Sequence, residues 1–213
     1  MNQKSLFAAA LVVMVVVFAG ATLIYRSSSG GAGPASDARM VSLDRAHAPS
    51  VGEADAEVVI VEFLDPACET CAIFYPAVKD VMAANPGQIR LVLRWAPFHE
   101  GSQGVVALLE AARLQGQFWP ALERLLANQS RWAINHVADV NLAWQQLGGL
   151  ELDRDKIIED MGSPEIQQII QQDMADATAN NVQATPEYFV NGRPLPSFGW
   201  DQLMGLIDEE LGR

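Results

Sequence analysis

Residues 58–71 read VVIVEFLDPACETC, an apolar run followed by two closely spaced cysteines. Val58 to Leu64 is apolar except for Glu62 and is rich in β-branched residues, which predicts a buried central strand. From Cys68 to Ala84 the apolar spacing becomes helical, and Ile89 to Trp95 predicts a second strand. The first strand therefore leads directly into a helix that begins at a pair of cysteines.

The rest of the chain is predicted to be mostly helical before it returns to strand. Four segments carry helical patterns: residues 104–129, 135–147, 157–162 and 164–180. The last of these helices begins with Ser163-Pro164, a capping serine followed by a proline in the first turn. Tyr188 to Val190 then predicts a strand, Asn191-Gly192 a type I′ turn, and residues 201–211 a closing helix.

Composition and charge limit the classes of protein that the chain can represent. Half of the 213 residues are hydrophobic and 19% are charged, which is typical of one well-cored globular domain. The formal net charge is −12, and the chain contains no run of Lys or Arg. Such a surface is a poor partner for nucleic acid, and it offers no basic patch for an anionic membrane.

The N-terminal segment predicts export. Leu6 to Tyr25 is an apolar stretch long enough to span a bilayer, with Lys4 before it and Arg26 after it. An uncleaved anchor is favoured over a cleaved signal peptide, although Ala19-Gly20-Ala21 has the small-residue spacing of a cleavage site. We expect a membrane anchor or signal segment (1–26), a flexible tether (27–45) and a folded domain (46–213). The domain would be periplasmic or otherwise extracytoplasmic, held at the inner membrane by residues 6–25.

The motif Cys68-Glu69-Thr70-Cys71 is the candidate chemical site. At the start of a helix, amide groups and the helix dipole favour the thiolate of Cys68, and Cys71 is placed to resolve a mixed disulfide. A structural zinc site needs four ligands, and the histidines are scattered at His47, His99 and His136. We interpret His99 as a structural histidine. A permanent structural disulfide is the other alternative, but it would close a very short loop.

Four segments resemble the DsbA-like branch of the thioredoxin superfamily: VVIVEFLDPACETC, RWAPFHEGS, QGQFW and ATPEYFVNGRPL. The resemblance implies an α/β thioredoxin fold with a helical domain inserted at about residues 99–180. It implies that Cys68 is the nucleophile, that Cys71 resolves, and that Thr185-Pro186 forms a cis-proline loop binding the substrate backbone. It also implies that Glu62 is a buried proton acceptor for Cys71, the alternative being a partly exposed carboxylate at the strand end.

The function expected from these features is that of an exported thiol-disulfide oxidoreductase. Its substrates would be cysteine-containing exported proteins, a membrane redox partner would reset the dithiol, and no cofactor is needed. The alternatives are a reductase or isomerase kept reduced by a membrane electron donor, and a chaperone that holds a soft metal such as copper. Thr70 stands where strongly oxidising relatives carry histidine, and Glu69 adds a negative charge. These changes predict a Cys68 pKa nearer the thioredoxin value of about 7 than the DsbA value of about 3.5.

Overall fold

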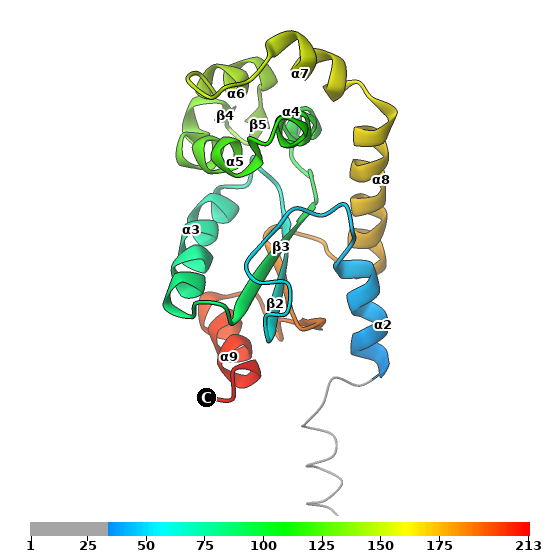
Figure 1. Cartoon of the computed structure of the whole chain (residues 1–213), viewed down its shortest axis with the longest axis vertical. Helices are drawn as coiled ribbons and strands as arrows, with labels where there is room; N and C mark the ends of the chain where they lie inside the picture. The colour runs from blue at the N-terminus through cyan, green and yellow to red at the C-terminus, as the bar shows by residue number, and fades with distance from the viewer. Residues whose placement is uncertain (1–33) are drawn as a thin grey trace, which may run out of the picture.

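The centre of the molecule is a five-stranded mixed sheet, seen nearly edge-on in the computed structural model (Figure 1). The structure describes residues 34–213, with side chains from residue 39 onward. The spatial strand order is β1-β3-β2-β6-β7. Strand β2 pairs in parallel with β3 and antiparallel with β6. The strands are β1 (Ser50–Val51), β2 (Val58–Leu64), β3 (Ile89–Trp95), β6 (Glu187–Val190) and β7 (Arg193–Pro194).

Helices cover both faces of the sheet and one of its ends. Figure 1 shows α3 (Glu69–Ala84) and α9 (Trp200–Glu210) on one side, with α2 (Pro34–Leu43) and α8 (Pro164–Ala179) on the other. The remaining elements pack together at one end of the sheet. They are α4 (Ser102–Leu114), α5 (Phe118–Ala127), η1 (Gln129–Arg131), β4 (Ala133–Ile134), β5 (Val137–Ala138), α6 (Val140–Gln146) and α7 (Arg154–Met161).

Strand β2 contributes alternate residues to two separate cores. Ile60 and Leu64 belong to the larger cluster, which includes the side chains of α3 and α9 and extends into the helical block. Val61 and Phe63 belong to the smaller cluster on the opposite face. By this alternation Glu62 lies on the same face as the two cysteines, so the strand aims one carboxylate toward the α3 side of the sheet.

The sequence-predicted elements are largely confirmed, with two corrections in the helical block. The segment 104–129 was expected to be continuous, but α4 and α5 are separated at Gly116, whose φ of 73° breaks the helix. The segment 135–147 was expected to be helical throughout. Asn135 and His136 instead form the β4–β5 turn with φ values of 54° and 64°, and α6 starts only after its capping residue, Asp139.

The expected flexible tether over residues 27–45 also needs correction. Residues 34–43 form the helix α2, and its last residue, Leu43, is fully buried in the smaller core. This burial gives the end of the segment a fixed place on the domain. The predicted membrane span at residues 6–25 lies outside the described residues. Between residues 34 and 213 no helix is both long and apolar enough to cross a membrane.

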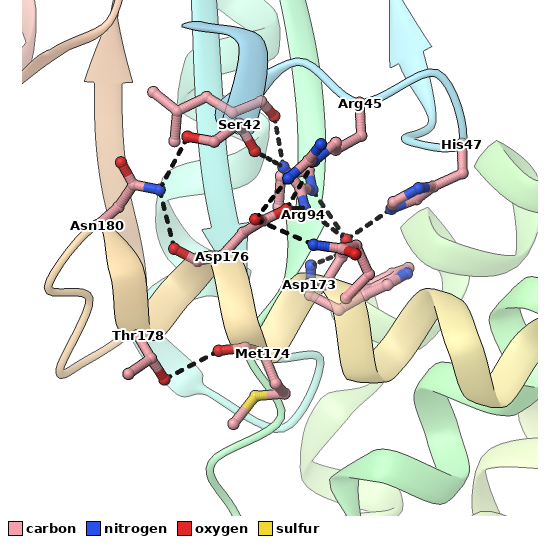
Figure 2. Close-up of polar contacts among 12 residues, drawn as sticks. Ser42, Arg45, His47, Arg94, Asp173, Met174, Asp176, Thr178 and Asn180 are labelled. Carbon is pink, nitrogen blue, oxygen red and sulfur yellow. Dashed lines mark hydrogen bonds and ion pairs between the residues drawn. The ribbon is translucent and has the colours of Figure 1, made fainter. Parts of the chain in front are cut away.

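A buried ionic cluster fixes this N-terminal segment to β3 and α8 (Figure 2). The guanidinium of Arg94 is fully buried and donates to Asp173 at 2.7 and 2.9 Å and to Asp176 at 2.7 Å. It also donates to the backbone carbonyls of Ser42 and Leu43 at 2.7 and 2.6 Å. Arg45 and His47 approach the same two aspartates from the segment after α2. Residues more than fifty positions apart are thereby held together.

Candidate dithiol site

Both cysteines lie where β2 gives way to α3. Cys68 is the extended residue that precedes the helix, and Cys71 lies in its first turn. Both are free thiols; Cys68 is 6% exposed and Cys71 is fully buried. The Cys68 thiol donates to the carbonyl oxygen of Thr185 at 3.1 Å. Cys68 is therefore the more accessible of the two thiols, as a dithiol exchange site requires.

The two thiols have opposite acid–base properties. A hydrogen bond from the Cys71 side chain lowers the pKa of Cys68 to about 5. Hydrogen bonds from the Thr185 side chain and from the backbone amides of residues 70 and 71 also lower this pKa, while burial opposes the shift. Burial raises the pKa of Cys71 well above its usual value, and the nearby charges of Glu62 and Cys68 add to the effect. Cys68 is thus the thiolate at neutral pH.

The value for Cys68 differs from the sequence-based expectation of about 7. That expectation considered only the helix terminus and the residues between the two cysteines. It missed the donors that converge on the sulfur from Cys71 and Thr185. Hydrogen bonds to the charged form lower a pKa. Here their effect on the Cys68 pKa is larger than the effect of having threonine instead of histidine at position 70.

The Thr185-Pro186 bond is cis, as the resemblance implied. The carbonyl of Thr185 accepts from the Cys68 thiol, so this loop lies directly against the dithiol. Strand β6 begins at the next residue, Glu187, and pairs with β2. The two sequence-predicted parts of the site, 117 residues apart along the chain, therefore meet.

Glu62 is fully buried on the dithiol side of the sheet, so the alternative of a partly exposed carboxylate is wrong. Neither of its oxygens has a hydrogen-bond partner among the side chains and backbone that the structure describes. Tyr188 is its cross-strand neighbour. Burial raises the pKa of Glu62 to about 8, with the Tyr188 side chain opposing the shift. Near neutral pH this carboxyl can hold and release a proton.

Asp65 is a site residue that the sequence reasoning missed. Its carboxylate is fully buried at the end of β2. It accepts from the amide of Ala67 at 2.9 Å, from the amide of His99 at 2.8 Å and from the hydroxyl of Ser102. The Nδ1 atom of His99 lies 2.7 Å from the same carboxylate. Asp65 thereby ties the turn before Cys68 to the loop after β3.

Gln129 is a second residue that no sequence signal indicated. It lies in η1, within the helical block, and its buried side-chain amide donates to the carbonyls of Pro66 and Cys68 at 2.8 and 2.9 Å. These carbonyls flank Ala67 in the turn that carries the first cysteine. The helical block therefore helps to position the dithiol.

A cavity of about 340 Å³ opens beside Cys68, and its walls include His99, His136 and Thr185. The imidazole rings of His99 and His136 stack with their centroids 5.6 Å apart. His99 was expected to be a structural histidine; its ring contacts Asp65, and the residue also lines the cavity. Within residues 34–213, no three His, Cys, Asp or Glu side chains are grouped to hold a metal ion.

The strand–helix dithiol facing a cis-proline loop, on a sheet with an inserted helical block, defines a protein of the thioredoxin type. A sequence model for the family described as thioredoxin matches residues 45–209. A probable disulfide bond formation protein D from Bacillus anthracis is 30% identical over 173 residues, which cover 76% of this chain and 77% of that protein. The chain belongs to the thioredoxin family, and this disulfide bond formation protein D is one of its relatives.

Two further relatives show how far the similarity extends. The crystal structure of a thioredoxin-like oxidoreductase from Silicibacter pomeroyi DSS-3 has a TM-score of 0.69 at 28% identity, and the match covers 81% of this chain and 97% of that one. The Na(+)/H(+) antiporter NhaA from Herminiimonas arsenicoxydans is 33% identical over 144 residues, 68% of this chain but 22% of the antiporter. The chain thus spans about a fifth of the length of the curated antiporters it matches.

Proposed function

We propose that this protein is an exported disulfide donor that oxidises pairs of cysteines in other exported proteins through Cys68 and Cys71. The observation that carries the proposal is the contrast between the two thiols. The pKa of Cys68 is lowered to about 5, and that of the buried Cys71 is raised well above its usual range. A stabilised thiolate favours the reduced form of the dithiol, which makes its disulfide a better oxidant.

The reaction begins with the oxidised protein, in which Cys68 and Cys71 form a disulfide. A client thiolate attacks the Cys68 sulfur, the bond between the two cysteines breaks, and its electron pair passes to Cys71. Glu62, whose raised pKa of about 8 keeps it protonated at neutral pH, supplies a proton to the Cys71 sulfur. A second client thiolate then attacks the client sulfur of the mixed disulfide, and Cys68 leaves as a thiolate.

Thr185 and Pro186 serve in this proposal as the backbone-binding part of the site. The Thr185 carbonyl already lies within hydrogen-bonding distance of the Cys68 sulfur. A client strand paired with this loop would bring its own cysteine next to Cys68. Backbone pairing carries no requirement for a particular client side chain.

Export and a membrane partner complete the proposal. Residues 6–25 would anchor the chain in the inner membrane or direct its secretion. The reduced dithiol would then be reoxidised by a membrane redox partner. The relative from Bacillus anthracis carries the name of a disulfide bond formation protein, which favours a donor over a reductase.

The experiment that tests the proposal traps the intermediate and measures the resting state. Cys71→Ser should accumulate mixed disulfides with client proteins in cells, because no second thiol resolves them, whereas Cys68→Ser should accumulate none. The wild-type dithiol should be predominantly oxidised in cells, as alkylation of free thiols would show. A predominantly reduced dithiol would instead establish a reductase or isomerase, and trapping by Cys68→Ser alone would reverse the two roles.

A further inference from the structure

The reaction proposed above begins with a client thiolate and names no group that takes the proton from the client thiol. A client thiol of ordinary pKa, about 8.5, is only a few per cent ionised at pH 7, yet only the thiolate attacks a disulfide. The low pKa of Cys68 assists the leaving group, and Glu62 lies beside the buried Cys71. Neither group acts on the thiol that approaches from the solvent side.

We propose that His99, oriented by Asp65, is the general base that removes this proton. The inference rests on the disulfide-donor function proposed above. His99 lines the cavity that opens beside Cys68, and its side chain is 26% exposed, so solvent and a client can reach it. It comes from the loop after β3, where the Asp65 carboxylate receives both its backbone amide and its ring nitrogen Nδ1.

The contacts of Asp65 determine which ring nitrogen is free. Its two oxygens accept from the amides of Ala67 and His99 and from the Ser102 hydroxyl, so this carboxylate acts as an acceptor toward every group around it. The Nδ1 atom of His99 therefore carries the hydrogen in the neutral ring, and Nε2 keeps its lone pair. Nε2 has no hydrogen-bond partner among the described residues. A buried carboxylate that orients an imidazole in this way is the arrangement found in nucleophile–histidine–aspartate triads.

The titratable groups around His99 come from three parts of the chain. Asp65 lies at the end of β2, His136 stacks on the ring from the β4–β5 turn, and Cys68 and Glu69 share the cavity from the start of α3. These contacts hold the ring of His99 in the same cavity as Cys68.

The complete step moves one proton from the client to His99 and one from Glu62 to Cys71. The client S–H bond breaks, its proton passes to Nε2 of His99, and the client sulfur forms a bond to Cys68. The bond from Cys68 to Cys71 breaks, its electron pair goes to Cys71, and Cys71 takes a proton from Glu62. The client sulfur is oxidised and Cys71 is reduced, after which His99 releases its proton to water. Asp65 is the positioning residue in this step and His99 the base.

The test uses two thiols that differ in whether they need a base. The oxidised protein is mixed at pH 7 with glutathione, an aliphatic thiol of ordinary pKa, or with an aromatic thiol that is already ionised at this pH. We expect His99→Asn, whose amide can still donate to Asp65, to slow reduction by glutathione at least tenfold, since general bases contribute about 10²-fold or more. The rate with the aromatic thiol should stay within about twofold. The matched control is His47→Asn, which removes the other histidine–aspartate contact, and both rates should be kept.

Each other outcome overturns the inference. Equal slowing with both thiols would mean that His99 only supports the turn, and unchanged rates would mean that it has no role. The pKa of Cys68, followed by thiolate absorbance, should not change in the variant; an increase would make His99 a stabiliser of the Cys68 thiolate instead. His99→Gln provides a second variant if His99→Asn does not fold. Failure of the wild-type disulfide to react with either thiol would refute the donor function itself.

Discussion

Replacing Glu62 with glutamine should stabilise the protein near neutral pH. Glu62 is fully buried, and burial raises the pKa of its carboxyl from 4.5 to about 8. Between these two pH values the folded protein keeps a proton that the unfolded chain releases. Stability therefore falls as pH rises through this window, since ∂ΔG/∂pH follows the difference in bound protons. Glutamine keeps the shape of the side chain and removes the titration.

The size of the effect follows from the width of the window. Each pH unit between 4.5 and 8 costs about 1.4 kcal/mol of unfolding free energy. At pH 7 the wild-type protein has lost about 3 kcal/mol relative to pH 4.5 because of this group alone. The difference in stability between Glu62→Gln and wild type should therefore grow by about 3 kcal/mol from pH 4.5 to pH 7. For a domain of this size that is a melting-temperature difference on the order of 10 °C.

The assay is urea unfolding of the reduced protein, the state to which the Glu62 pKa of about 8 applies. Other ionisable groups act equally in both proteins and cancel in the difference. Glu53→Gln, a change at an exposed carboxylate, is the matched control and should alter stability by no more than about 0.5 kcal/mol. A difference for Glu62→Gln that is flat from pH 5 to pH 8 would refute the reasoning. The same variant should resolve mixed disulfides more slowly, because Glu62 no longer exchanges a proton with Cys71.

Three further predictions concern the turn and the ionic cluster. Thr70→His should lower the pKa of Cys68 below about 5 and raise the reduction potential of the dithiol. Glutathione titration should place the wild-type potential between about −270 and −120 mV, and a variant more reducing than wild type would contradict the argument. Gln129→Leu should lower the free energy of unfolding in urea by about 1–3 kcal/mol and slow disulfide exchange, because the carbonyls of Pro66 and Cys68 lose their donor. An unchanged exchange rate would show that Gln129 does not belong to the site. Arg94→Met should lower the free energy of unfolding, measured in urea, by about 3–5 kcal/mol, because it breaks a buried ion pair. Arg193→Met, at a surface ion pair, should lower it by no more than about 1 kcal/mol, and equal losses would contradict the role of burial.

The parts of the fold that were predictable are those with a local cause. The strands Val58–Leu64 and Ile89–Trp95 have the predicted bounds, because a run of apolar β-branched residues suits a strand buried on both faces. Helix α8 begins where predicted because the Ser163 hydroxyl accepts from the amide of Ile166. The break after α4 was missed because periodicity continues across it, and only the backbone conformation at Gly116 separates the two helices.

The site divides in the same way. The two cysteines were predicted from their motif, and the cis-proline loop from the resemblance of ATPEYFVNGRPL to a known family. Asp65 and Gln129 carry none, and their contacts join residues 34 and 61–63 positions apart. An aspartate before a proline is equally typical of an ordinary turn. What made these residues functional candidates was their burial and the number of donors or acceptors around them, and a sequence does not contain that information.

Strand β2 shows how such surroundings assign different tasks to similar groups. Glu62 and Asp65 are three residues apart and both are fully buried. Glu62 faces the apolar core and has no hydrogen-bond donor among the described residues, so its carboxyl holds a proton at neutral pH. Asp65 receives four donors, so it can fix a loop and orient an imidazole. In the proposed reaction, β2 and the residue that follows it thus place a proton source beside the fully buried sulfur and an anchor for a proton acceptor beside the more accessible one. Thiol-disulfide exchange needs both, because one sulfur gains a proton as another loses it.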